Sequence, residues 1–263
     1  MFEQIQMGEL LVWRFVPAAP GTHAFFSSRT GGLSPAPFDS LNLGFHVGDD
    51  PELVAGNRAI LCSSLDIDPA RVTSPRQRHT PVVSVLENND DIGAGSTGEA
   101  SVFDPCDGLI TSIPDAPLLL HFADCVPVVL TALTEDEKPL VGVVHAGRQG
   151  LVDGIVRNSV AALFKNHRAV PEATSVAIGP CIGSCCYEVD EDAASDFVKR
   201  FGPERAKGRF IDLGSAVADE LAAAGVWRAN IARLEICTSC NDHFYSYRRD
   251  GITGRHGAIA WIE

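Results

Sequence analysis

Three segments of the sequence end an apolar run with a side chain that binds borderline metal ions. The residues are His79, Cys125 and His145, in segments 77–81, 123–127 and 144–147. Two imidazoles and one thiolate form a catalytic zinc set, because three protein ligands leave a fourth position where the metal can activate water or orient substrate. Their separations match no local zinc motif, and a lone His or Cys beside apolar strands is most often a core residue. Spacing alone therefore gives only a weak case for a metal site.

Asp124 lies directly before Cys125 and is a candidate acid or base. Zinc deaminases move protons with a carboxylate that does not bind the metal, so Asp124 could carry a proton or orient a water molecule. The alternative role is a hydrogen bond within a turn. The sequence leaves both roles open.

A second group of cysteines lies in the last third of the chain: Cys181, Cys185, Cys186, Cys237 and Cys240. The Cys237-x-x-Cys240 spacing is typical of a metal site or a redox pair. A four-thiolate site normally shows two closely spaced pairs, whereas Cys181 and Cys185 are separated by three residues. We therefore predict free thiols, with a structural zinc or cluster site as the alternative.

The elements that must position these residues follow from apolar periodicity. Short apolar runs predict strands at 10–15, 23–26, 82–86, 118–122, 126–133, 140–144, 231–236 and 258–262. Three-to-four spacing predicts an amphipathic helix over 149–166, and further helices are predicted at 51–65 and 214–224. Regular βαβ spacing is absent from the sequence. We therefore predict an α/β layered fold with a mixed β-sheet core and flanking helices, in a single domain over residues 1–263.

The charge balance restricts the classes of partner. With 21 Lys and Arg against 34 Asp and Glu, the net charge is −13, which disfavours nucleic-acid binding because phosphates would be repelled. A small anion needs only a local arginine cluster. The N-terminus lacks a basic stretch followed by a long apolar one, and the most apolar region, 117–133, contains His121 and Asp124. We expect no membrane association and a cytoplasmic location with reduced thiols, and make no prediction of oligomeric state.

Read together, the segments resemble the YfiH-type family, also called the laccase-domain or peptidoglycan-editing-factor family. The matching segments span nearly the whole chain: 26–34, 40–44, 47–50, 57–58, 107–111, 123–128, 145–147, 178–183, 187–189 and 244–251. The resemblance implies that His79, Cys125 and His145 bind a single zinc ion. It also implies phosphorolysis of purine nucleosides, including adenosine, inosine and methylthioadenosine, with adenosine deamination as a second activity.

Phosphorolysis requires a phosphate beside the anomeric carbon of the sugar, and guanidinium groups match phosphate oxygens well. Arg29 and Arg248 lie in matching segments and are the predicted phosphate- or substrate-binding arginines. Arg249 is disfavoured, because adjacent residues on a strand point to opposite faces. Asn42 is predicted to hydrogen-bond ribose or base.

Two motifs depart from the family pattern. The usual His-Ala-Gly-Trp-Arg-Gly reads His-Ala-Gly-Arg-Gln-Gly at 145–150, so the arginine comes one position early. A Gln-Val-His-Gly pattern reads Gln-Arg-His-Thr at 77–80, which adds a positive charge beside the predicted metal ligand. A changed substrate preference is the expected consequence.

Three other functions compete with the nucleoside phosphorylase and deaminase. Copper-dependent polyphenol oxidation needs many imidazoles at paired spacing, but the chain has eight His and no His-x-His, so zinc is favoured over copper. An amide hydrolase that edits peptidoglycan precursors would use the same zinc chemistry and stays open. A noncatalytic nucleotide-binding module is disfavoured, because binding alone does not need a metal with an open position.

Overall fold

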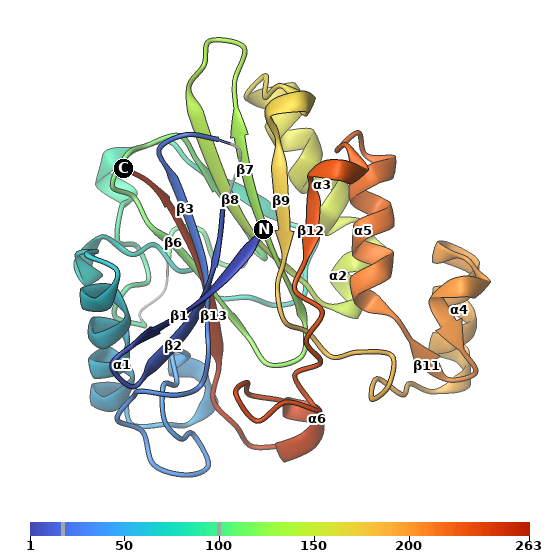
Figure 1. Cartoon of the computed structure of the whole chain (residues 1–263), viewed down its shortest axis with the longest axis horizontal. Helices are drawn as coiled ribbons and strands as arrows, with labels where there is room; N and C mark the ends of the chain where they lie inside the picture. The colour runs from blue at the N-terminus through green and yellow to red at the C-terminus, as the bar shows by residue number, and fades with distance from the viewer. Residues whose placement is uncertain (17–18, 99–100) are drawn as a thin grey trace.

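Two β-sheets pack face to face in the computed structural model, which describes residues 1–16, 19–98 and 101–263 (Figure 1). The first sheet is antiparallel and has the order β1 (Phe2–Met7), β2 (Leu10–Phe15), β3 (Thr22–Ser27), β13 (His256–Ile262), β6 (Leu118–Phe122). The second has the order β12 (Ile231–Arg233), β9 (Ser175–Ile178), β7 (Val126–Leu133), β8 (Pro139–Ala146), β5 (Gly108–Thr111), β4 (Val83–Leu86). It is mixed, because β4–β5 and β9–β12 are parallel pairs.

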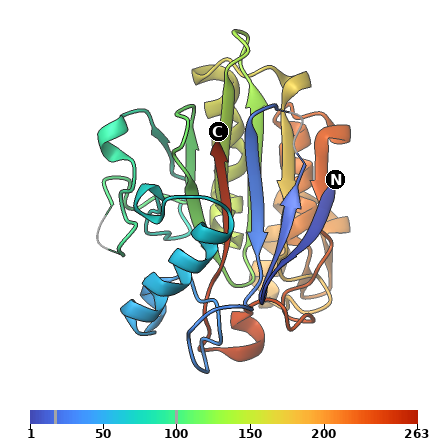
Figure 2. The same cartoon turned by 60° about the vertical axis from the view of Figure 1, so that its left-hand side comes forward.

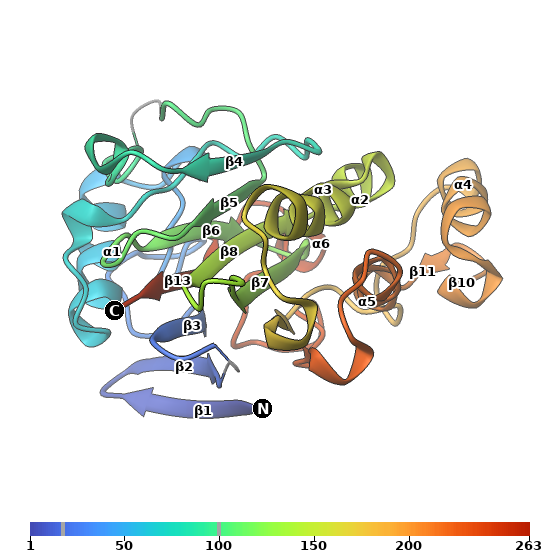
Figure 3. The same ribbon diagram turned by 90° about the horizontal axis from the view of Figure 1, so that it is seen from above.

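Helices cover the outer faces of the two sheets, as the views in Figures 2 and 3 show. Helix α1 (Pro51–Ser64) packs on the antiparallel sheet. Helices α2 (Arg148–Asp153), α3 (Ile155–Ala161) and α5 (Leu213–Ala223) pack on the mixed sheet. The remaining α-helices and strands of the described residues are helix α4 (Glu191–Phe201), the short strand pair β10 (Ala206–Lys207) and β11 (Phe210–Ile211), and helix α6 (Tyr247–Asp250). None of the described helices is long and apolar enough to cross a membrane.

Alternation along the central strands explains why the sheet is covered on both faces. On β7, Val129 lies in the core between the sheets, while Val128 and Leu130 lie in the core beneath the helices. On β8, Val143 and Val144 divide in the same way. Successive side chains of a strand point to opposite faces, so a continuous apolar run is what a strand between two cores requires. The predicted layered α/β fold with a mixed sheet is confirmed.

The predicted helix over 149–166 is wrong as a single element. It starts at Arg148 and is interrupted at Gly154, whose φ of +101° lies in the left-handed region. The Gly154 N–H donates to the carbonyls of Gly150 and Leu151, which is a typical glycine-terminated helix end. The chain then continues as α3 and a π-helical turn over Ala162–Asn166. The predicted apolar face is present, but Gly154 interrupts the helix that carries it.

Candidate metal centre

Antiparallel pairing brings the three predicted ligands to one end of the mixed sheet. Val126, the first residue of β7, pairs with Ala146, the last residue of β8, so Cys125 and His145 lie at the same end. Gly108, the first residue of β5, pairs with Val144, which adds the segment before β5 to this end. The loop before β4 carries His79 to the same place, because β4 and β5 are parallel and start together.

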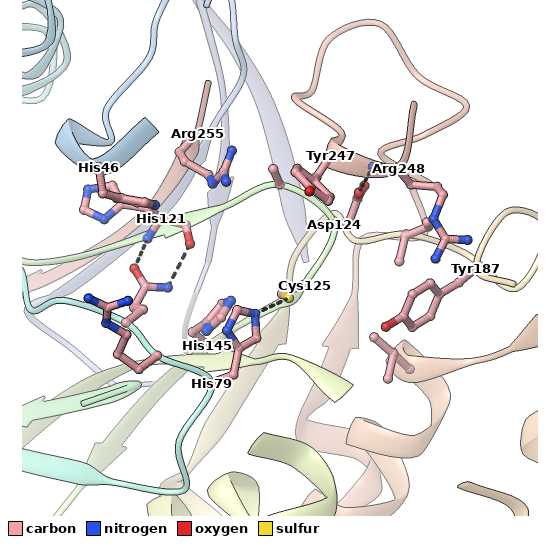
Figure 4. A pocket seen from close by; sticks show the side chains of 15 residues that line it. His46, His79, His121, Asp124, Cys125, His145, Tyr187, Tyr247, Arg248 and Arg255 are labelled. Carbon is pink, nitrogen blue, oxygen red and sulfur yellow. Dashed lines mark hydrogen bonds between the residues drawn. The ribbon is translucent and has the colours of Figure 1, made fainter. Parts of the chain in front are cut away.

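Donor atoms of His79, Cys125 and His145 all lie within 4.8 Å of one another. The Cys125 Sγ is 3.5 Å from the His79 Nε2, and the two imidazole centroids are 4.9 Å apart (Figure 4). Borderline nitrogen and sulfur donors on this scale fit one zinc-sized ion. The structure thus brings all three predicted ligands together.

Asp107 organises the site and was not singled out from the sequence. Its buried carboxylate accepts a hydrogen bond from the His145 Nδ1 at 2.7 Å, which leaves the His145 Nε2 for a metal. The same carboxylate accepts from the backbone N–H groups of Arg78, His79 and Thr80 at 2.7–3.1 Å. A carboxylate behind a ligating histidine fixes its tautomer and direction. One side chain therefore orients two of the three ligands.

Two of the six described non-glycine residues with positive φ lie at this centre. His79 and Asp124 both have positive φ, +59° and +90°, a conformation that non-glycine residues adopt rarely and mostly at functional sites. Gly147 is required for a different reason, since a Cβ there would lie 2.5 Å from the His79 Cδ2 and 3.1 Å from the Cys125 Sγ. The backbone is shaped to leave room for the three donors.

Charges at the centre favour the metal-binding form of the thiol. Burial raises the pKa of Cys125, but the charge of His145 and hydrogen bonds with His145 and His79 outweigh burial and lower this pKa to about 6. Burial lowers the pKa of His145, but the Cys125 thiolate and Asp107 raise it to about 9. Without metal, the two side chains therefore form a thiolate–imidazolium pair at neutral pH, and a metal ion that binds must displace the imidazolium proton.

The donors open into a cavity of about 670 Å³. Figure 4 shows the three candidate ligands between two groups of side chains, with His46, His121 and Arg255 on one side and Asp124, Tyr187, Tyr247 and Arg248 on the other. Arg78 also lines the cavity, which gives it three guanidinium groups in a chain of net charge −13. Such a local cluster can hold an anion that the rest of the surface repels.

Two histidines at the first end, the buried His121 and the more exposed His46, are held neutral. Burial, followed by the charges of Arg255 and Arg58, lowers the pKa of His46 to about 4. Burial and the charge of Arg58 also lower the pKa of His121. An Arg58 guanidinium N–H donates to the His121 Nε2 at 2.9 Å, so the His121 proton resides on Nδ1. A second hollow of about 330 Å³, lined by His46, His121, Arg58, Arg76 and Arg78 among others, adjoins this end.

The predicted catalytic residue Asp124 and the predicted substrate-binding residue Arg248 both line the cavity. Both oxygens of Asp124 accept hydrogen bonds at 2.7 Å, from the Thr238 hydroxyl and from the Arg248 backbone N–H. Arg248 donates from its side chain to the carbonyl of Glu188 at 2.8 Å and lies over the Tyr187 ring. Their predicted functions remain predictions.

Arg29 and Asn42 lie outside the residues that line the cavity. Arg29 forms an ion pair with Asp39 at 3.1 Å and lies over the Tyr245 ring. Asn42 is fully buried, and its side-chain oxygen accepts from the Arg255 backbone N–H at 2.9 Å. Asn42 thus contacts the backbone of a residue that lines the cavity.

Four of the five cysteines in the second group also meet. The thiols of Cys185, Cys186, Cys237 and Cys240 lie within 4.8 Å of one another, whereas Cys181 is not part of this cluster. We call these four residues the loop thiol cluster.

Comparison with known proteins agrees with the resemblance found in the sequence. Residues 23–263 match the family described as multi-copper polyphenol oxidoreductase laccase. The chain belongs to the YfiH-type laccase-domain family. It is 36% identical over 249 residues to a protein named purine nucleoside phosphorylase YlmD from Geobacillus stearothermophilus, with 91% of this chain and 89% of the relative covered. A Streptomyces griseus protein named purine nucleoside phosphorylase ORF3 is 34% identical over 255 residues, with 95% and 98% covered.

Solved structures of two other proteins share the fold. The crystal structure of YlmD from Geobacillus stearothermophilus matches with a TM-score of 0.89 and 34% identity, covering 100% of this chain and 98% of that one. YfiH from Bacillus licheniformis matches with a TM-score of 0.89 and 30% identity, covering 100% and 99%. The predicted family is confirmed. The family description names copper, whereas the relatives' names state purine nucleoside phosphorylase, so the comparisons leave the metal open.

The sequence did not predict most of the cavity wall of this laccase-domain chain, nor Asp107, which lies behind the candidate ligands. Asp107 lies in a matching segment, but it precedes a glycine and looks like a turn residue. Tyr187 also lies in a matching segment, while His46 and Arg255 lie just beyond two others. The available signal was a polar or aromatic side chain inside or beside a matched segment. It could not show which of these side chains converge.

Proposed function

We propose that the protein is a zinc-dependent purine nucleoside phosphorylase that cleaves adenosine, inosine and methylthioadenosine, with adenosine deamination as a side activity. One observation carries the proposal: a single cavity joins a three-ligand metal site, three guanidinium groups and two tyrosine rings. Phosphorolysis needs an anion site, a face for an apolar base and an electrophile within one pocket. The names of the relatives support the same reaction class.

We assign phosphate to the end of the cavity lined by Arg78 and Arg255. Both guanidinium groups can donate to phosphate oxygens, and the neutral imidazoles of His46 and His121 can add N–H donors without requiring acid. Arg78 stands where the family pattern has valine, so it strengthens anion binding in this chain. Among the predicted arginines, Arg248 lies in the cavity and remains a candidate phosphate or substrate contact.

We assign the purine to the end lined by Tyr187 and Tyr247. An aromatic ring offers a flat apolar face for stacking, and the Arg248 guanidinium already lies 5.2 Å from the Tyr187 ring centroid. Burial and the charge of Cys125 raise the pKa of Tyr187, so its hydroxyl stays protonated at neutral pH and can donate to the base. Arg148, the residue displaced from the family motif, acts on the same tyrosine through its charge.

His79, Cys125 and His145 would hold the metal, since they supply three donors at one open end of the cavity. When bound, zinc supplies Lewis-acid chemistry at the fourth position. In phosphorolysis the glycosidic C1′–N9 bond breaks, a C1′–O bond to phosphate forms, and the leaving purine gains a proton. Asp124, beside Cys125, is our proposed proton carrier; any transfer competes with its two existing hydrogen bonds.

Copper-dependent phenol oxidation is the alternative named by the family description. Within residues 1–16, 19–98 and 101–263, one cluster of three or more candidate ligands contains histidine, and the other contains only cysteine. A multicopper centre needs several imidazole-rich sites, so one mixed site supports the nucleoside reaction better.

The test is product analysis with inosine and adenosine, each with and without phosphate. Inosine should give hypoxanthine and ribose 1-phosphate only when phosphate is present. Adenosine should also give some inosine without phosphate, because water is the nucleophile in deamination. Inosine cleavage that does not depend on phosphate would show a hydrolase instead, and a fully inert zinc-loaded protein would remove the proposal.

A further inference from the structure

The loop thiol cluster has the dimensions of a preformed cage for one metal ion. The Cys240 Sγ lies 3.3 Å from the Cys186 Sγ and 3.6 Å from the Cys185 Sγ, and all four sulfurs lie within 4.8 Å of one another. Tetrahedral zinc with bonds of about 2.3 Å places its sulfur ligands roughly 3.8 Å apart. The observed spacing brackets that value.

Two adjacent turns create the cage. The backbones of Cys181 and Cys237 form a parallel bridge, with hydrogen bonds from the Cys181 N–H to the Ile236 carbonyl and from the Thr238 N–H to the Cys181 carbonyl. The turns that follow close through hydrogen bonds from the Cys186 N–H to Gly183 and from the Cys240 N–H to Cys237. Each turn therefore contributes one closely spaced pair. The first pair is Cys185–Cys186 and excludes Cys181.

Backbone groups around the cage suit thiolates. The Gly183 N–H donates to the Cys237 Sγ at 3.2 Å, as expected where a backbone amide supports a ligating sulfur. A Cβ on Gly183 would lie 3.1 Å from the Cys185 Sγ and 3.5 Å from the Cys237 Sγ, so glycine lets the turn approach both sulfurs. These contacts form a defined sulfur site, beyond mere proximity of four cysteines.

Two arginines lie beside the loops where a negative site would need them. A divalent ion with four thiolates leaves a net charge of about −2. The Arg248 guanidinium donates to the Cys186 carbonyl at 3.3 Å, and the Arg249 guanidinium donates to the carbonyls of Thr238 and Asn241 at 2.9 and 3.2 Å. Both turns of the cage are thus bound to a fixed positive charge.

We propose that Cys185, Cys186, Cys237 and Cys240 bind a second zinc ion, which is structural and separate from the centre at Cys125. Four sulfur donors saturate tetrahedral zinc and leave no position for substrate. A set this compact fits one ion, since the ligands of an iron–sulfur cluster bind different irons and spread farther apart. The ion would bind as the thiols release their protons, without any change of oxidation state.

The proposed ion would connect the loop that leads to Tyr187 in the cavity wall with the Cys237–Cys240 loop, which contacts another residue of the wall. Cys186 directly precedes Tyr187, and its carbonyl accepts from Arg248. Cys237 directly precedes Thr238, whose hydroxyl donates to Asp124 at 2.7 Å. Loss of the ion should loosen this wall while leaving His79, Cys125 and His145 in place. The inference concerns metal binding and stands whether or not the protein cleaves nucleosides.

The first test is zinc content of protein purified under reducing conditions. We expect about two zinc ions per chain in the wild type and about one in Cys240→Ser. The Cys240 side chain is exposed, so its replacement should leave the fold intact. Cys181→Ser is the matched control, since it lies on the same turn segment outside the cluster, and should keep both ions. One ion in the wild type, together with an unchanged content in Cys240→Ser, would overturn the proposal.

The second test identifies the ligands in Cys125→Ala protein loaded with cobalt(II), where the loop thiol cluster is the remaining group of described cysteines whose thiols lie together. The visible d–d bands should be those of a tetrahedral site, and the near-ultraviolet sulfur-to-cobalt absorption should match four thiolates. Adding Cys240→Ser to this variant should reduce or abolish both signals. A cobalt-free Cys125→Ala protein, or a thiol titration showing the four cysteines paired in disulfides after reducing purification, would contradict a metal site.

Discussion

The two clusters of candidate ligands differ in how the fold holds them. His79, Cys125 and His145 lie at the end of a six-stranded sheet and face a cavity, with Asp107 fixing two of them from behind. The loop thiol cluster lies on two turns, with Cys185 and Cys240 exposed. The first set has three donors and one side open to the cavity, whereas the second has four donors, which would leave no open position on a tetrahedral ion. This comparison indicates that a rigid sheet can support chemistry at an incomplete site, while loops need a complete site to become rigid.

We call His79, Cys125 and His145 the sheet-end set. The largest expected effect is the loss of catalytic activity when a member of this set is replaced. In Cys125→Ala, nucleoside cleavage should fall by roughly a thousandfold, because metal catalysis contributes several kcal/mol. Circular dichroism should stay unchanged, since Cys125 lies outside the three core clusters. Steady-state kinetics and zinc analysis check this together. Full zinc content with full activity would show that Cys125 is not a ligand.

Replacement of the carboxylate behind the ligands should have the next largest effect. In Asp107→Asn, the amide cannot accept all the hydrogen bonds now donated by His145 and by the backbone of residues 78–80. Zinc affinity should fall by about 10–100-fold, as measured by competition with a chromophoric chelator. An affinity within twofold of wild type would mean that Asp107 serves the fold alone.

Breaking the loop thiol cluster should have a smaller effect of another kind. In Cys240→Ser, the KM for inosine should rise by about threefold to tenfold with a smaller change in kcat, because the wall with Tyr187 loosens while the sheet-end set remains. Cys181→Ser, assayed in parallel, should behave as wild type. A loss of kcat as large as that of Cys125→Ala would erase the distinction between the two clusters.

The last effect falls on acid stability alone and concerns a histidine outside both clusters. His256 is fully buried between Phe122 and Phe244, and neither of its ring nitrogens has a hydrogen-bond partner within the described part of the chain. Burial, with the charges of Arg255 and Arg29, lowers the pKa of His256 from 6.5 to about 3. The unfolded state therefore takes up a proton that the folded state refuses, so stability is lost as pH falls below about 6.5.

In His256→Phe this contribution should disappear. Thermal unfolding from about pH 6.5 to 5 should then show a smaller loss of stability than in the wild type, by roughly 1.5 kcal/mol. Zinc content should not change, which separates this effect from both clusters. Equal acid sensitivity in the two proteins would show that His256 does not set the acid limb.

Much of the fold was predictable because local pattern and environment agree. The predicted strand from Val126 to Leu133 coincides with β7, since a continuous apolar segment rich in valine fits a strand between two cores. Short or polar elements were missed, such as β1, which has an exposed, polar face, and the four-residue β5. Gly154 was hidden inside an otherwise helical pattern.

The site was predictable only in part, because its residues meet through long-range pairing. His79, Cys125 and His145 were identified together through the family resemblance, while their spacing carried little information. Asp107 gains its function from the antiparallel pairing of β5 with β8, which no local pattern contains. The Asn42 side chain accepts a hydrogen bond from the Arg255 backbone, so it supports the fold next to the cavity. A matching segment cannot show whether a residue supports the fold or contacts substrate.

The most direct test of the sheet-end set is phosphate-dependent cleavage of inosine by metal-stripped and by zinc-reloaded protein. Reloaded wild type should form hypoxanthine and ribose 1-phosphate in equal amounts, while stripped protein and Cys125→Ala treated with zinc should form them roughly a thousandfold more slowly. Copper-loaded protein that oxidises phenols rapidly, with zinc-loaded protein inert toward every nucleoside, would contradict the account and favour the oxidase.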